Sequence, residues 1–399
     1  MVTQALPRTV VVLGLVSLLN DAASEMVTPL LPVFLVATLG AGPTIVGLIE
    51  GLAETTASLL KLVSGRLADR GWNARGLVLG GYTLSNLARP LIGLAISWTF
   101  VLGLRFLDRV GKGIRSAPRD AMIATAIAPE GRGRAFGFQR SMDHTGAVIG
   151  PLLAFALLAQ NVALRDVIAA SAVIGTVVVA LLLFGLGPRE VVQARPEPRS
   201  APLTWRGLDV RLRRLLTACA ILALATTPEA FLVLWARERG ISIADVALLW
   251  ASASLLKMAV AYPAGILSDR LGRGVVLVTG WAIRVALLAF LALAPAPAHR
   301  ATAWTLFILY AGSLALTEAA ERSLVGDVAP PDQRGTAFGV YHLVTGLLIL
   351  PGALVFGIVW EYVGASYAFA MAAMLTALAV ASMWGALGRF PAGPARVRR

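Results

Sequence analysis

A short charged sequence occurs twice in this chain, 200 residues apart, and each copy stands between two long apolar segments. The first copy reads G-R-L-A-D-R from Gly65 and is followed by Arg75, and the second reads G-I-L-S-D-R from Gly265 and is followed by Arg273. A charged stretch between apolar segments is typical of a tight turn that joins two membrane helices at the bilayer surface. The repeat therefore predicts a duplicated membrane protein whose halves carry this turn at the same place.

The composition is that of a chain that lies mostly in a lipid bilayer. Hydrophobic residues make up 57% and charged residues 14% of the sequence, whereas about one quarter of a typical soluble domain is charged. A spanning helix needs about 20 apolar residues, so 399 residues accommodate about twelve helices with their connections. We predict an all-α polytopic membrane protein with twelve transmembrane helices, near residues 10–38, 43–64, 77–96, 98–118, 135–159, 166–187, 214–236, 243–264, 275–295, 301–325, 336–360 and 364–387.

The segment 188–211 separates two halves of similar make-up. It holds Pro188, Pro196 and Pro198 among arginines and glutamates, with little apolar content, as linkers do. A second repeated sequence supports this division, because R-A-F-G-F from Arg134 and R-G-T-A-F-G from Arg334 enter equivalent helices. Copies on the same side of the membrane need an even number of helices between them. We predict two pseudo-symmetric six-helix bundles, 1–187 and 212–399, joined by a cytoplasmic linker.

The net charge of +13 arises from arginines at alternate helix ends. The chain ends, the two repeated turns and the linker are rich in arginine, whereas the opposite helix ends hold only Arg165, Arg237, Arg239 and Arg300. Because positively charged loops stay in the cytoplasm, we expect both termini there, with anionic lipids rather than nucleic acid as the partners of this charge. Cys219 is the only cysteine, which excludes disulfides and cysteine metal sites within the chain.

The repeated turn resembles the loop between helices 2 and 3 of the major facilitator superfamily, whose pattern is roughly G-x-L-A-D-R-x-G-R-R. The resemblance covers the whole chain because the turn is paired with the expected topology. The family's antiporter signature on helix 4, R-x-x-Q-G-x-G, is matched by Arg105 and Gly111, whereas Asp108 and Arg109 depart from it and leave antiport open. The matches to the loop pattern, which the resemblance makes the candidate gating motif, are Gly65, Leu67, Ala68, Asp69, Arg70 and Arg75 in the first half, with Asp269 and Arg270 in the second.

This resemblance implies a bacterial secondary transporter that moves a small solute by alternating access. It implies a monomer in the inner cell membrane, without a cofactor. It further implies that Asp69 and Arg70 hold the two halves together when the cytoplasmic side is closed.

Charged side chains inside the predicted helices point to the mechanism, because each is costly in lipid unless it is paired or faces water. Asp21 and Glu25 share a face of the first helix, so that stretch is not a signal peptide, and Asp21 falls near the midplane. Glu229 adjoins Pro228, which lacks an amide hydrogen and loosens the seventh helix there. Glu50, Glu54 and Lys61 form a stripe on the second helix, and a cationic ladder descends the fourth through Arg105, Arg109, Lys112, Arg115 and Arg119.

The competing interpretation is that these charges neutralise one another, since buried pairs add little net stability. Their near balance gives no preference for the sign of a substrate. A structural pair is the favoured interpretation of Glu321 and Arg322, and four tryptophans, Trp98, Trp235, Trp304 and Trp360, are expected as interface anchors. The candidate coupling and substrate residues are Asp21, Glu25, Glu54, Arg105, Asp108, Arg109, Asp143, Glu229 and Glu318.

The sequence holds no nucleotide-binding P-loop, so an ion or solute gradient is the expected energy source. Several carboxylates and no evident sodium site favour protons, and proton-coupled efflux is the first hypothesis. A metal-cation carrier using the carboxylates of the first two helices, or an organic-anion carrier using the ladder, by symport or uniport, stays open. No metal-ligand spacing predicts a bound metal. A membrane enzyme is disfavoured by the lack of a catalytic constellation, and a channel by the two-half repeat.

Overall fold

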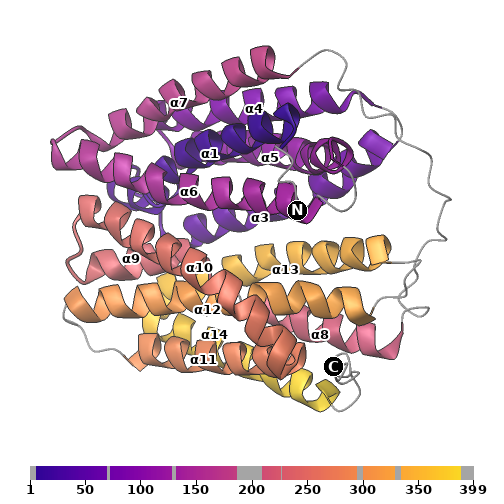
Figure 1. The fold of residues 1–399 in the computed structure, drawn as a ribbon. Coiled ribbons are helices and arrows are strands. Elements are labelled where there is room, and N and C mark those ends of the chain that lie inside the picture. The colour runs from indigo at the N-terminus through magenta and orange to yellow at the C-terminus, as the bar shows by residue number, and fades with distance from the viewer. Residues whose placement is uncertain are drawn as a thin grey trace. The chain divides into compact units, whose positions relative to one another are not determined.

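We analysed a computed structural model of the chain, which describes residues 6–69, 72–127, 132–186, 209–225, 227–293, 300–328 and 334–387. Within these ranges the structure is helical and contains no strand (Figure 1). The chain divides into two compact units. Unit 1 comprises Met1–Ala41, Leu52–Glu197 and Ser242–Ala251, and unit 2 comprises Gly42–Gly51, Pro198–Ile241 and Ser252–Arg399.

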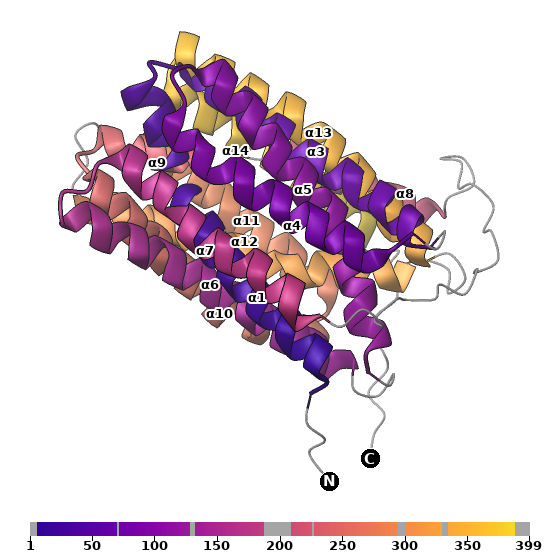
Figure 2. The same cartoon turned by 90° about the horizontal axis from the view of Figure 1, so that it is seen from above.

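In unit 1, α1 packs against α6 and α7, and α4 packs against α5 and α7. Figure 2 shows α4 and α5 running side by side. An apolar core formed by α1, α4, α5, α6 and α7 includes Leu13, Val78 and Val178. The first nine elements of the chain are α1 (Arg8–Val27), α2 (Leu31–Val33), η1 (Phe34–Thr38), α3 (Pro43–Asp69), α4 (Ala74–Leu91), η2 (Ile92–Leu94), α5 (Trp98–Thr125), α6 (Arg132–Ala159) and α7 (Leu164–Gly185).

In unit 2, α11 packs against α12 and α14, and α8 packs against α13 and α14. Its core holds Leu215, Leu277 and Trp281 together with Cys219, which is a free, buried thiol. The remaining elements are α8 (Val210–Leu224), α9 (Glu229–Glu238), α10 (Ile243–Leu271), α11 (Arg273–Leu293), α12 (Arg300–Val328), α13 (Arg334–Tyr362) and α14 (Ala365–Leu387).

The offset of 200 residues seen in the sequence recurs in the backbone. Gly40 and Gly240 have positive φ angles of 65° and 79°, a conformation that glycine adopts without steric cost. The first apolar segment is interrupted between α1 and α2, and the seventh between α8 and α9, where Pro228 precedes α9. The interruption predicted at Pro228 is therefore confirmed. The division into units also repeats at this offset. Two segments are assigned to a different unit from the rest of their helices, and they lie 200 residues apart: Gly42–Gly51 and Ser242–Ala251.

The repeated charged sequence is helical where the structure describes it, which corrects its interpretation as a turn. The first copy lies in the last turns of α3, which continues to Asp69, and the second lies in α10, which continues to Leu271. Glycine only weakens a helix interior slightly, so Gly65 and Gly265 do not end these helices. The chain reverses after the motif, at Gly272 in the second copy.

Nine helical segments in the described part of the chain are long and apolar enough to span a membrane. The segments α3, α4 and α5 do not meet this criterion, although each covers a predicted span. Their charges lower the hydropathy, because they include Glu54, Arg89 and Arg109 in the middle of otherwise apolar sequence. The count of twelve spans therefore stays a prediction.

Two of the predicted interface tryptophans are instead core residues. Trp235 is fully buried and Trp360 is 7% exposed. The Trp360 ring lies 5.4 Å from that of Phe231, in a tilted arrangement, and 5.5 Å from that of Phe369, edge to face. Aromatic pairs at these separations add to the stability of a core, so this cluster stabilises unit 2 from within.

Candidate functional site

Two carboxylates from different helices meet where α1 packs closely against α6. A Cβ at Gly146 of α6 would overlap the carbonyl oxygen of Leu18, and it would lie 3.0 Å from the Cβ of Asp21. Glycine therefore allows the close approach that brings Asp21 of α1 and Asp143 of α6 within electrostatic range of each other. Both side chains are partly buried, so water screens the repulsion between them only in part.

Neutral amides donate hydrogen bonds to these two carboxylates, and Arg119 lies within electrostatic range of Asp143. Asn20 Nδ2 donates to Asp21 Oδ1 at 3.2 Å, and Gln139 Nε2 donates to Asp143 Oδ2 at 2.6 Å. Arg140 approaches Asp143 only to 3.8 Å, and its side chain is 56% exposed. The Oδ1 atom of Asp143 is buried and has no hydrogen-bond partner among the described residues. This oxygen can accept a hydrogen bond from a solute or from water, or it can bind a proton.

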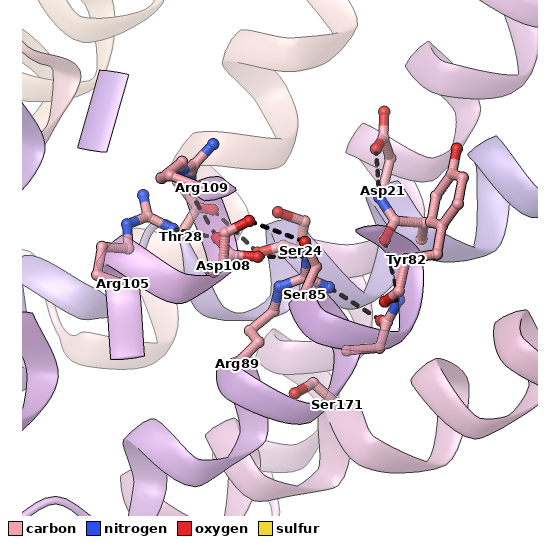
Figure 3. A network of polar contacts seen from close by, with 12 residues as sticks. Asp21, Ser24, Thr28, Tyr82, Ser85, Arg89, Arg105, Asp108, Arg109 and Ser171 are labelled. Atoms are coloured by element: carbon pink, nitrogen blue, oxygen red, sulfur yellow. Dashed lines mark hydrogen bonds and ion pairs between the residues drawn. The ribbon is translucent and has the colours of Figure 1, made fainter. Parts of the chain in front are cut away.

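A third carboxylate, Asp108, is buried among arginines where α4 packs on α5 (Figure 3). A Cβ at Gly111 would overlap Gly81 O and Ser85 Oγ, so glycine is needed for the two helices to come this close. Asp108 Oδ1 lies 3.0 Å from Arg89 Nη2. The other carboxylate oxygen, Oδ2, lies 3.5 Å from Arg105 Nη1 and 3.6 Å from Arg109 Nε.

Hydrogen bonds join the Asp21 region to the Asp108 region. Asn86 Nδ2 donates to Asn20 Oδ1 at 3.2 Å, and Arg89 Nη1 donates to Asn86 Oδ1 at 3.2 Å. Because Asn20 contacts Asp21 and Arg89 contacts Asp108, a continuous polar path runs from α1 through α4 to α5 (Figure 3). Sequence reasoning missed both asparagines. The sequence feature that could have identified them is an amide side chain inside an apolar helix. Asn86 also precedes Arg89 by three residues, which places both on the same helical face.

The lower part of the cationic ladder binds neutral groups as well as acids. Arg115 Nη1 donates to Ser85 Oγ at 2.6 Å, and its guanidinium lies 4.4 Å from the centre of the Tyr82 ring. Arg119 donates to Ser17 Oγ at 3.2 Å and pairs with Asp120 at 3.0 Å. The ladder therefore faces α4 and α1 of its own unit at these positions.

Two further predicted carboxylates have partners in unit 1. Glu54 of α3 is within electrostatic range of Lys112, Arg109, Lys61 and Arg105. Glu25 of α1 accepts a hydrogen bond from Trp250 Nε1 of α10 at 2.8 Å. The structure thus brings Asp21, Glu25, Glu54, Arg105, Asp108, Arg109 and Asp143 together in one unit.

In unit 2, Glu229 stands at the first position of α9, directly after the interruption of the helix. Lys257 Nζ of α10 contacts both of its carboxylate oxygens, at 2.6 and 2.8 Å. A carboxylate is also favoured at a helix N-terminus by the helix dipole. The two side chains are 21% and 27% exposed, so this pair is partly accessible.

Glu318 and Glu321, one turn apart on α12, have different partners from those expected. Arg322 pairs with Glu318 at 2.7 Å, and both side chains are about half exposed. Glu321 instead accepts hydrogen bonds from Trp281 Nε1 at 3.1 Å and Tyr341 Oη at 3.0 Å. The expected Glu321–Arg322 pair is therefore replaced by a Glu318–Arg322 pair, because residues four apart lie on the same helical face.

The candidate gating motif is described only in part. Arg70 and the side chains of Asp69 and Asp269 lie outside the described residues, and the Arg270 side chain is exposed. Arg75 Nη2 donates to the carbonyl oxygen of Leu183 at 3.2 Å. In the second half, Arg273 donates to Ser323 O at 2.9 Å and pairs with Asp327. Both arginines therefore tie the start of one helix to the end of another within their own unit.

The chain is similar to known membrane transporters over nearly its whole length. The model of the Major Facilitator Superfamily matches residues 13–353 and 215–398. An uncharacterized MFS-type transporter of Methanocaldococcus jannaschii is 32% identical, over 89% of both chains. The multidrug resistance protein MdtH of Aeromonas hydrophila is 25% identical, over 88% of this chain and 87% of its own.

Among solved structures, a bacterial homolog of the human lysosomal transporter Spinster, in an inward-facing and unoccupied conformation, superposes with a TM-score of 0.77. The alignment covers 96% of this chain and 97% of that one at 16% identity, which shows a common fold. The family model, the relative at 32% identity and the fold agree. The chain belongs to the Major Facilitator Superfamily of transporters and is a multi-pass membrane protein.

Proposed function

We propose that this transporter exports a small solute in exchange for protons, by alternating access. The observation that carries the proposal is the close packing of α1 on α6 at Gly146, which brings Asp21 of α1 and Asp143 of α6 within electrostatic range of each other. A proton bound to either carboxylate removes this repulsion. Because the two groups stand on different helices, protonation changes the packing energy between α1 and α6. A ligand that binds two conformations unequally shifts their populations, and the proton is such a ligand here.

The name of a relative and the distribution of arginines support the direction and the setting of transport. One relative is named a multidrug resistance protein, which favours export as the direction here. The distribution of arginines favours an inner-membrane protein with both termini in the cytoplasm, acting as a monomer in contact with anionic lipids. The two halves 1–187 and 212–399 would move relative to each other during the cycle, with the motif residues Gly65, Asp69, Arg70, Arg75, Asp269 and Arg270 as the gate.

A metal-cation carrier is the less supported alternative. Hard cations need several converging oxygen ligands. No group of three or more histidine, cysteine or acidic side chains within the described ranges is placed to hold a metal ion. Glu54 and Asp108 are instead close to lysine and arginine side chains, which repel a metal cation.

Proteoliposomes with an acidic lumen test the proposal. The purified full chain is reconstituted, a library of small solutes is added one by one, and lumenal pH is followed with a trapped fluorescent dye. We expect at least one solute to release protons from vesicles with the wild-type chain, and none to do so with Asp21→Asn. Solute accumulation at a rate that does not depend on the pH gradient would overturn proton coupling.

A further inference from the structure

Unit 2 contains a buried arginine in the middle of a membrane-spanning segment. Arg284 is the twelfth of the 21 residues of α11, a helix that is long and apolar enough to cross a membrane, and it is 7% exposed. A charged side chain at this depth is costly unless it has a partner, so an arginine here indicates a functional role when the fold supplies no counter-ion. The contacts of Arg284 therefore decide its role.

The hydrogen-bond partners of Arg284 carry no charge. A Cβ at Gly280 would overlap the side chain of Thr317, so glycine lets α11 come close to α12 here. Arg284 Nη2 donates to Thr317 Oγ1 at 3.0 Å and to the carbonyl oxygen of Ser313 at 3.4 Å. Its Nε atom is buried and has no hydrogen-bond partner among the described residues. The guanidinium group thus keeps its charge and has an unused donor in the interior.

The carboxylates on nearby helices bond to other groups. In the part of unit 2 that the structure describes, no hydrogen bond or ion pair joins Arg284 to a carboxylate. The described residues therefore supply no counter-ion that contacts Arg284. The acidic side chains of α9 and α12 have these partners: Glu229 has Lys257, Glu238 has Arg239, Glu318 has Arg322, Asp327 has Arg273, and Glu321 has Trp281 and Tyr341.

Two buried hydroxyl groups extend the site from Arg284 to the interruption before α9. Tyr310 of α12 lies within electrostatic range of Arg284 and of Glu229, and its hydroxyl donates to the carbonyl oxygen of Thr227 at 3.4 Å. Thr227 stands between α8 and α9, and its own Oγ1 atom is buried without a hydrogen-bond partner in the described ranges. The side chains of the adjoining Glu229–Lys257 pair are 21% and 27% exposed, so the site reaches partly accessible groups.

We propose that Arg284 binds the carboxylate or sulfonate group of the transported solute, with the hydroxyls of Tyr310 and Thr227 as further donors, so that the substrates are organic monoanions. The inference rests on the proposed function, because it names the substrate class of that transporter. The planar fork of arginine matches an oxygen pair and forms charge-assisted hydrogen bonds with it. One guanidinium group carries one positive charge, so a single negative charge neutralises it, while Lys257 neutralises Glu229.

Thermal unfolding of the ligand-free chain tests whether Arg284 lacks a counter-ion. Arg284→Gln removes a buried charge without leaving a charged partner behind, so we expect the Tm to stay the same or to rise. Arg89→Gln is the reference, because it deprives the buried carboxylate of Asp108 of its partner at 3.0 Å and should lower the Tm. Equal losses for the two variants would show that the fold supplies a partner for Arg284 and would overturn the assignment.

Ligand-induced thermal stabilisation of the purified full chain tests the substrate class without any gradient, because a ligand of the folded state raises the Tm with concentration. The probes share one apolar ring system and differ in charge: 1-naphthoate and 1-naphthalenesulfonate against 1-naphthylmethylammonium, at constant ionic strength. We expect at least one of the two anions to raise the Tm in a saturable manner and the ammonium compound to leave it unchanged. Stabilisation by the ammonium compound, or by none of the three, overturns the assignment.

Variants locate the binding group. Arg284→Gln should weaken the apparent affinity for the stabilising anion at least tenfold, and Tyr310→Phe, which removes one hydroxyl, should weaken it less. Arg165→Gln is the matched control, because Arg165 also donates to neutral acceptors, the carbonyl oxygens of Gly93 and Ala95 at 3.0 and 2.7 Å, but belongs to unit 1. Equal affinities of Arg284→Gln and Arg165→Gln for the anion would contradict a site at Arg284.

The binding and transport experiments fail separately. Anion binding that is saturable but produces no proton release in the vesicles contradicts proton coupling and leaves the substrate class standing. Proton release driven only by cationic solutes contradicts the anion assignment and leaves proton coupling standing.

Discussion

Arg89 of α4 and Asp108 of α5 form an ion pair inside unit 1, with 3.0 Å between Nη2 and Oδ1 and at most 3% of either side chain exposed. The other carboxylate oxygen lies 3.5 Å from Arg105 Nη1 and 3.6 Å from Arg109 Nε. Removing one partner of a buried pair leaves the other charged and poorly solvated, which costs about 3 to 5 kcal/mol. The Asp108 carboxylate therefore stabilises the buried arginines at the contact between α4 and α5.

Asp108→Asn should strongly destabilise the protein, by about 3 to 5 kcal/mol, because three guanidinium groups then face a neutral amide. The measurement is the loss of Tm of the detergent-purified chain. Adding Arg89→Leu to Asp108→Asn should restore part of that loss, since the second change removes one of the buried charges left behind. Asp120→Asn is the control, because its carboxylate is 49% exposed and should change stability by less than about 1 kcal/mol. Simple additivity of the two core substitutions would show that Arg89 and Asp108 are not coupled.

Asp21→Asn should abolish transport driven by a pH gradient while the Tm stays close to that of the wild type. The amide is similar in size to the carboxylate and can still interact with Asn20, but it cannot exchange a proton at physiological pH. Transport in proteoliposomes with and without the gradient measures the effect. Asp166→Asn, at an exposed carboxylate in the first turn of α7, should keep full gradient dependence. A variant at Asp21 that still concentrates solute against its gradient would assign coupling to another group.

Glu229→Gln should destabilise the protein more than Lys257→Met does. In Lys257→Met the remaining carboxylate keeps the favourable field of the α9 N-terminus, whereas in Glu229→Gln the remaining ammonium group has lost its carboxylate. Partial exposure of the pair limits the difference to about 1 kcal/mol. Thermal unfolding of both variants and of the double variant gives the order. A larger loss for Lys257→Met would exclude a stabilising role for the helix N-terminus.

Tyr341→Phe should cost about 1 to 3 kcal/mol, because it removes one of the two hydrogen bonds that Glu321 accepts from Trp281 and Tyr341. Thermal unfolding in detergent measures the loss. The matched control is Tyr362→Phe. The Tyr362 side chain is 78% exposed, so its hydroxyl can bond to solvent. An equal effect of the two substitutions would mean that the Tyr341 hydroxyl contributes nothing specific.

The broad organisation of the protein follows from local sequence properties. Apolar segments of spanning length and the interruption at Pro228 each depend on the residues of one segment, so they are visible without the fold. The repeat at an offset of 200 residues is equally visible, because it needs only a comparison of the sequence with itself. The same local properties misled at the charged motif, where helix formation continues through Gly65 and Gly265. Nothing within one copy of the motif shows that its helix continues to Asp69 or Leu271.

The candidate site depended on contacts between segments that are far apart in the chain. The sequence determined that Asp21, Asp108, Arg109 and Asp143 lie inside predicted membrane helices, and their near balance with other charges left the sign of a substrate open. Tertiary structure decided that Asp108 is shared by three arginines and that Asp21 and Asp143 lie within electrostatic range of each other. It did so because glycines at 111 and 146 let particular helices approach closely, and because burial, which depends on all neighbouring helices, determines which charges water can screen.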